Sequence, residues 1–182
     1  MSEIYQPKQD SFLLSKVIKT QIPRLLKQNK NLIFLEIGCG SGIQLKTALN
    51  FGIKKHNIFS CDINSEAVEY CKKLGFDSVK SNLFENIKEK YHLIIFNPPY
   101  LPENKKEPKD SRIATTGGKK GSEITNKFLK QAKNHLKKDG KIFLLTSSLT
   151  KQINFSGYKK KIIEKEKLFF EELRVLELTL IV

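Results

Sequence analysis

The chain has 182 residues, of which 39% are hydrophobic and 29% charged, so its composition is that of a folded domain rather than a disordered chain. No apolar run approaches the ~20 residues that cross a bilayer, which excludes a membrane-spanning protein. The first five residues lack the basic and apolar layout of a signal peptide, so we expect a cytoplasmic protein with no membrane partner.

The formal net charge is +14, and only three of the 33 basic residues are arginine. Nucleic-acid readers favour arginine, because the planar guanidinium donates two hydrogen bonds at once. Lysine spread evenly along the chain favours a solvated surface, although a nucleic-acid partner stays open. The three cysteines include no C-x-x-C pair, and the three histidines stand alone, so we expect no metal site.

Apolar spacing predicts helices that alternate with strands. Asp10–Gln28 is the first expected helix, with Asp10 or Ser11 as its cap and Pro23 as a possible break. Further helices are expected at Ser41–Phe51, Ser65–Leu74, Ser122–Lys137 and Leu149–Phe155. Strands are expected at Leu32–Ile37, Asn57–Asp62, Phe76–Lys80, Tyr91–Phe96, Lys141–Thr146, Lys159–Lys165 and Arg174–Ile181.

This alternation predicts an α/β fold of the doubly wound kind, with a mostly parallel seven-stranded sheet and helices on both faces. The last two strands lack a long crossover helix, so they should pair antiparallel at the C-terminal edge. We expect residues 1–182 to form a single domain that includes residues 1–31 as an N-terminal helical segment.

A glycine turn, Glu36–Gly42, follows the first strand at the edge where ligands bind in such sheets. Gly38, Gly40 and Gly42 depart from the dinucleotide pattern G-x-G-x-x-G, and the strand ends in an acid, Glu36. A carboxylate there repels a pyrophosphate but suits the ammonium and sulfonium of S-adenosylmethionine. The predicted cofactor is therefore S-adenosylmethionine, with S-adenosylhomocysteine as its product.

Two further positions suit the rest of this cofactor. Asp62 ends the second strand, where a carboxylate can accept both ribose hydroxyls. Asn82 and Leu83 follow the third strand and could meet the adenine, through the Asn82 side-chain oxygen and the Leu83 backbone amide.

The most specific feature is the turn Asn97-Pro98-Pro99-Tyr100 after an apolar strand. The prolines fix φ and remove two donors, so they form a rigid ledge that presents the Asn97 side-chain oxygen and the Pro98 carbonyl beside the Tyr100 ring. Two such acceptors can hold a planar NH2 group by its protons and aim its nitrogen at a methyl donor. We expect amino-group methylation without a strong general base.

These residues resemble class I methyltransferases of the HemK-like release-factor glutamine methyltransferase family. Tyr5–Leu14 matches the family's Tyr-x-Pro-x-x-Asp-Thr/Ser pattern, and Ala114–Gly121 is similar to its A-x-x-G-G-x-x-G loop. Only about 31 residues precede the first strand, which is typical of the short archaeal and eukaryotic branch. The resemblance implies N5-methylation of the glutamine in the Gly-Gly-Gln loop of a class I peptide release factor, together with a small zinc-ribbon activator subunit.

The resemblance also implies roles for individual residues. The cofactor site would include Ser11, Glu36, Gly38, Asp62, Asn82, Leu83 and Asn97, and the substrate glutamine would meet Asn97, Pro98, Pro99, Tyr100 and Leu101. Asn82 stands where the family usually has aspartate, and Gln6 where it often has glutamate, so weaker contacts are expected at both.

Two other functions stay open at this point. The Asn97–Tyr100 ledge is shared with enzymes that methylate the exocyclic amine of adenine or guanine in DNA or RNA, and the +14 charge would suit such a substrate. A non-catalytic module that keeps only the cofactor fold is the other alternative, which the complete motifs disfavour.

Overall fold

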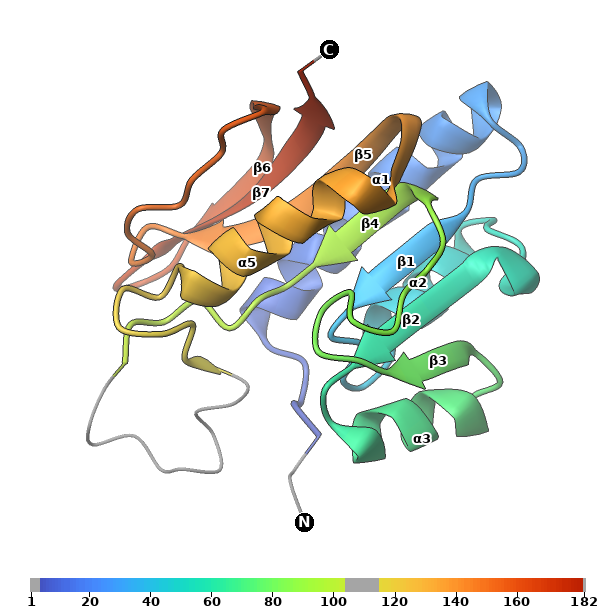
Figure 1. The fold of residues 1–182 in the computed structure, drawn as a ribbon, viewed down its shortest axis with the longest axis horizontal. Helices are drawn as coiled ribbons and strands as arrows, with labels where there is room; N and C mark the ends of the chain where they lie inside the picture. The colour runs from blue at the N-terminus through green and yellow to red at the C-terminus, as the bar shows by residue number, and fades with distance from the viewer. Residues whose placement is uncertain (1–3, 104–114, 182) are drawn as a thin grey trace.

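The computed structural model describes residues 4–103 and 115–181, so Ala114, the first residue of the expected loop Ala114–Gly121, lies outside the described residues. Within these ranges, seven strands form one sheet in the order β3-β2-β1-β4-β5-β7-β6 (Figure 1). The strands are β1 Phe34–Ile37, β2 Ile58–Asp62, β3 Asp77–Lys80, β4 Tyr91–Phe96, β5 Leu136–Ser147, β6 Tyr158–Lys167 and β7 Glu172–Leu180. The helices are α1 Gln9–Gln28, α2 Ile43–Asn50, α3 Ser65–Lys73 and α5 Glu123–Ala132, with 3-10 turns at Lys55–Asn57 and Lys133–His135.

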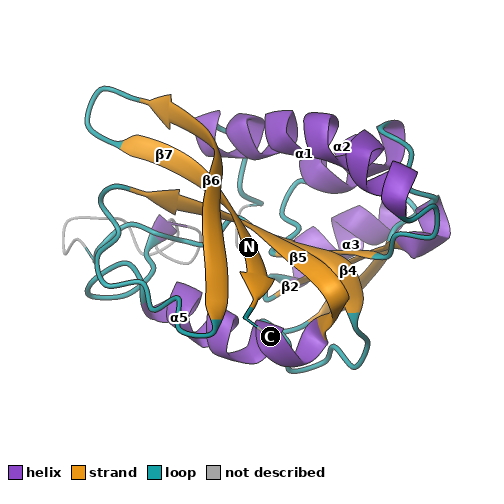
Figure 2. Cartoon of the chain, turned by 90° about the horizontal axis from the view of Figure 1, so that it is seen from above, coloured by secondary structure: helices purple, strands orange, loops and turns teal. Residues whose placement is uncertain are grey.

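The sheet is covered on both faces (Figure 2). One buried cluster joins α1, α2 and α3 to alternate residues of the strands, including Phe34 and Phe143. The other joins α5 to the opposite side chains, including Leu35 and Phe128. Since successive side chains of a strand point to opposite faces, the central strands contribute apolar side chains to both clusters.

The predicted arrangement of strands is confirmed. Strands β1 to β5 pair in parallel, whereas β7 pairs antiparallel with both β5 and β6. The residues 169–170 form the exposed tip of the β6–β7 hairpin. None of the helices within residues 4–103 and 115–181 is long and apolar enough to cross a bilayer.

Two expectations about α1 were wrong. The helix is capped by Lys8, without a side-chain hydrogen bond, and neither Asp10 nor Ser11 is the cap. The helix also continues through Pro23, whose ring removes one hydrogen bond. Pro23 lies on the exposed side of the helix, where water can satisfy the carbonyl that the proline leaves free.

Two further helix expectations were wrong after Ser122. Helix α5 ends at Ala132, and Asp139-Gly140 lies inside β5 instead of stopping a helix, because Leu136 already pairs with Tyr91 in the sheet. Residues 149–155 form no helix. Gln152 adopts a φ of 63°, and this segment instead bonds to Asn126 of α5, whose side chain donates to the Gln152 carbonyl at 3.1 Å.

Candidate functional site

The carboxyl ends of the central strands bring the predicted site residues to one edge of the sheet. Because the strand order is β3-β2-β1-β4, this edge carries Asn82, Asp62, Glu36 and Asn97 in that spatial order. The site therefore runs as a row from the outer strand β3 to the central strand β4, although its members are far apart in the chain.

The glycine turn is built from left-handed backbone. Gly38, Gly40 and Gly42 have φ values of 72°, 45° and 69°, a region that residues with a Cβ rarely adopt. The Gly38 backbone N–H donates to the Cys61 carbonyl at 2.8 Å, so the turn is tied to the end of β2. A Cβ on Gly42 would lie 3.2 Å from the Cys71 sulfur, which shows how closely the turn packs on α3.

Glu36 is an unsatisfied acid at the centre of the row. Its side chain is 5% exposed, and its Oε2 atom has no hydrogen-bond partner among the described residues. Burial raises the pKa of the Glu36 carboxyl well above its ordinary value; Cys71 and Asp62 add to the shift, and the Leu45 backbone N–H opposes it. A buried carboxylate of this kind needs a cation or a donor from a ligand.

Asp62 links the glycine turn to the end of β2. Its Oδ2 accepts from the Gly40 backbone N–H at 2.9 Å, and its Oδ1 accepts from the Asn64 N–H at the same distance. Burial raises the pKa of the Asp62 carboxyl, while backbone N–H groups that include those two oppose the shift. A carboxylate has about four acceptor positions, so Asp62 can still take ligand hydroxyls.

Asn82 and Leu83 lie after β3, where the adenine contact was predicted. The Asn82 Nδ2 donates to Glu85 Oε1 at 2.9 Å, which holds the side chain in place. Leu83 is buried and has a φ of 56°, and its carbonyl accepts from the Ser81 hydroxyl at 2.8 Å. The adenine contacts of both residues stay predictions.

The side-chain amide of Asn97 has a hydrogen-bond partner at its nitrogen but none among the described residues at its oxygen. Its Nδ2 donates to Asp10 Oδ2 at 3.0 Å, whereas its buried Oδ1 has no hydrogen-bond partner among the described residues. Asp10, which lies 87 positions away in the chain, was expected only as a helix cap. The signal that could have found it is the Tyr5-x-Pro-x-x-Asp10 pattern, whose two outer residues meet through a 3.0 Å bond from the Tyr5 hydroxyl.

The ledge after β4 is held against the described part of the glycine-rich loop. Leu101 and Thr116 form an isolated parallel β-bridge. The Tyr100 carbonyl accepts a hydrogen bond from the Thr150 hydroxyl at 3.0 Å. A Cβ on Gly117 would lie 2.4 Å from the Pro99 carbonyl oxygen, and one on Gly121 equally close to that of Tyr100. The first and third glycines of the loop, Gly117 and Gly121, are therefore required by close packing.

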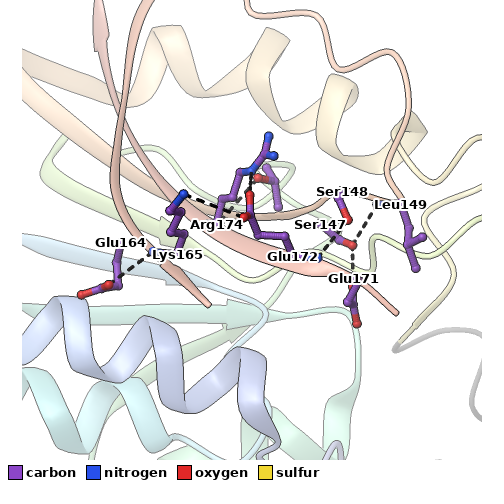
Figure 3. A network of polar contacts seen from close by, with 9 residues as sticks. Ser147, Ser148, Leu149, Glu164, Lys165, Glu171, Glu172 and Arg174 are labelled. Carbon is purple, nitrogen blue, oxygen red and sulfur yellow. Dashed lines mark hydrogen bonds and ion pairs between the residues drawn. The ribbon is translucent and has the colours of Figure 1, made fainter. Parts of the chain in front are cut away.

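Two acids lie near the tyrosines beside the ledge. Burial, Asp10 and Glu171 raise the pKa of the Tyr100 hydroxyl, and burial with the same two acids raises that of Tyr5. Glu171 accepts from the Ser147 hydroxyl at the end of β5, within the polar network near the turn of the β6–β7 hairpin (Figure 3). Asp10 and Glu171 therefore both act on these tyrosines, while Lys8 Nζ lies 5.7 Å from the centroid of the Tyr5 ring.

Comparison with known proteins identifies the family. The model of the methyltransferase small domain matches residues 13–165. The chain belongs to this family. Among similar proteins, this methyltransferase is 38% identical to the candidate protein N5-glutamine methyltransferase MJ0928 of Methanocaldococcus jannaschii, over 96% of the chain and 90% of the relative.

Two further matches agree with this assignment. The methyltransferase is 28% identical to the eRF1 methyltransferase catalytic subunit mtq2 of Schizosaccharomyces pombe, over 82% of the chain and 74% of the relative. The solved Mtq2–Trm112 complex of E. cuniculi, described as methylating the termination factor eRF1, aligns over 98% of both chains with a TM-score of 0.67 and 20% identity. The predicted fold class and S-adenosylmethionine dependence are therefore confirmed.

The described residues fit this cofactor. The orphaned Glu36 oxygen can accept from its ammonium, and the carboxylate attracts both of its positive charges. Asp62 retains acceptor capacity for the ribose. When bound, S-adenosylmethionine supplies a methyl group on a positively charged sulfur. The residue assignments remain proposals that rest on this fit.

Proposed function

We propose that this methyltransferase methylates the side-chain nitrogen of the glutamine in the Gly-Gly-Gln loop of a class I peptide release factor, in the cytoplasm. The observation that carries the proposal is the buried, unpartnered Asn97 Oδ1 at the end of β4. The names of the relatives support the substrate, because they include a protein N5-glutamine methyltransferase and an eRF1 methyltransferase.

The ledge explains how an unreactive amide nitrogen can be used. The lone pair of an amide is delocalised into its carbonyl, so the nitrogen is a poor nucleophile. Asn97 Oδ1 and the Pro98 carbonyl accept the two amide protons, which returns electron density to the nitrogen and aims it at the cofactor side of the row. The proton that the nitrogen loses passes to solvent, and no histidine is required.

Two carboxylates near the ledge argue against the alternative of a nucleic-acid substrate. Asp10 and Glu171 act on the tyrosines beside the ledge, and carboxylates repel a phosphate backbone. A neutral or basic peptide loop suits this charge better.

We also propose a small zinc-ribbon activator subunit as partner. The S. pombe relative is named a catalytic subunit, and the E. cuniculi neighbour was solved as a complex. Strand β3 is an edge strand that can pair with an added strand, and exposed hydrophobic side chains lie at or beside it: Ile63, Tyr70 and Val79. Val79→Lys should abolish co-purification with the subunit and leave cofactor affinity unchanged.

The decisive experiment uses the enzyme with labelled cofactor, with and without the candidate activator subunit. We expect the release factor to be labelled, and a Gln→Ala change in its Gly-Gly-Gln loop to abolish the label. Labelling of DNA or RNA instead, with strong salt dependence, would establish the alternative. Asn97→Ala should abolish turnover and largely preserve cofactor affinity; full activity of this variant would contradict the role of the ledge.

A further inference from the structure

We propose that Asp10 is a positioning residue that fixes the amide orientation of Asn97, an inference that rests on the proposed function of the ledge. A carboxylate oxygen can only accept hydrogen bonds. The 3.0 Å contact between Asp10 Oδ2 and the Asn97 amide therefore requires the NH2 group to face Asp10. The carbonyl oxygen Oδ1 must then face the opposite way, where it is the acceptor that the substrate amide needs.

Asp10 is itself held rigidly, as a positioning residue must be. It is 5% exposed, and its Oδ1 accepts from the Ser11 backbone N–H at 2.6 Å and from the Ser11 hydroxyl at 3.3 Å. Its Oδ2 accepts from the Tyr5 hydroxyl as well as from Asn97, each at 3.0 Å. Four donors thus surround the carboxylate, which matches the acceptor capacity of the group.

The first turn of α1 is anchored in turn. The buried Gln44 of α2 donates to the Ser11 carbonyl at 2.8 Å and accepts from the Ser15 hydroxyl at the same distance. Asp10 also lies in the first turn of α1, where the helix dipole favours a negative charge. These contacts keep the carboxylate in one place, so the orientation of Asn97 is set before the substrate binds.

The isosteric change Asp10→Asn tests this directly. The Ser11 N–H would still require an oxygen in the place of Oδ1, so the new NH2 group would face Asn97. Two NH2 groups cannot bond, and the Asn97 amide would turn over, which would present a donor to the substrate in place of an acceptor. We expect kcat to fall about 100-fold, the cost of misplacing a reacting group by about 1 Å, while affinity for S-adenosylhomocysteine and melting temperature stay near wild type.

Nuclear magnetic resonance provides a readout that needs no methyl acceptor. The Asn97 side-chain NH2 signals, assigned with Asn97→Ala, should shift and exchange faster with solvent in Asp10→Asn. Asp77→Asn, an exposed change of the same kind, should leave them unmoved. The swapped pair Asp10→Asn/Asn97→Asp restores a donor facing an acceptor and should recover activity that Asp10→Asn lacks.

The possible results separate the two proposals. Unmoved Asn97 signals in Asp10→Asn, a wild-type kcat, or a swapped pair no more active than Asp10→Asn would overturn the positioning role. If the signals move as expected but the wild-type enzyme never labels a release factor, the proposed substrate fails and the positioning of Asn97 stands.

Discussion

Cofactor binding should depend on pH through Glu36. Burial raises the pKa of this carboxyl in the free protein, whereas the positive charges of the cofactor favour the ionised form and lower the pKa in the complex. Binding must therefore release a proton when the pH lies between the two values, and affinity should rise with pH across that window.

The size of the effect follows from linkage. A shift of one pKa unit corresponds to about 1.4 kcal/mol, so affinity should rise by up to about tenfold per pH unit while the free carboxyl is protonated. The cofactor's own amino group loses its proton near pH 8, so the measurement belongs below about pH 7. Glu36→Gln should bind S-adenosylhomocysteine weakly and with little pH dependence.

Isothermal titration calorimetry in two buffers of different ionisation enthalpy measures the released proton. The exposed change Glu69→Gln is the matched control and should behave like wild type.

The raised pKa of Glu36 also affects folding stability. A group whose pKa is higher in the folded state than in the unfolded state contributes its full stability below the unfolded pKa, and this contribution is lost as the pH rises through the folded pKa. Glu36→Gln should therefore melt higher than wild type near neutral pH. Flat affinity with no proton release in the wild type would refute this reasoning.

Three further changes test other parts of the structure. Gly117→Ala places a Cβ 2.4 Å from the Pro99 carbonyl oxygen, so methyl transfer should be lost while S-adenosylhomocysteine still binds in calorimetry; normal turnover would show that the loop does not support the ledge. Phe128→Ala removes a fully buried ring that packs on Phe84 and Phe96 and should lower the unfolding free energy by about 3–5 kcal/mol in urea titrations. Asn82→Asp should tighten cofactor binding only together with Glu85→Gln, because the Asn82 amide now bonds to that carboxylate at 2.9 Å; tightening by Asn82→Asp alone would contradict this.

The hydrophobic pattern of a segment predicted its secondary structure correctly where that structure depends mainly on the segment's own residues. The apolar run Tyr91–Phe96 is a strand with the predicted bounds, because it is buried on both faces. The secondary-structure prediction failed where pairing with a segment distant in the sequence determines the conformation. A helix was predicted as far as Lys137, yet Leu136 and Lys137 belong to β5, because Leu136 pairs with Tyr91 of β4. Residues 149–155 likewise bond to α5 instead of forming a helix.

The sequence by itself determined the row of predicted site residues, because parallel strands must end at the same edge and each motif follows a strand. It also contained Asp10, but local rules could only suggest a helix cap there. The tertiary structure alone decided that this carboxylate accepts from the Asn97 side chain, 87 positions away, and that Asn97 Oδ1 has no partner among the described residues. The physical reason is that hydrogen-bond orientation and burial depend on which groups the fold brings together. Local sequence does not show which distant residues will meet.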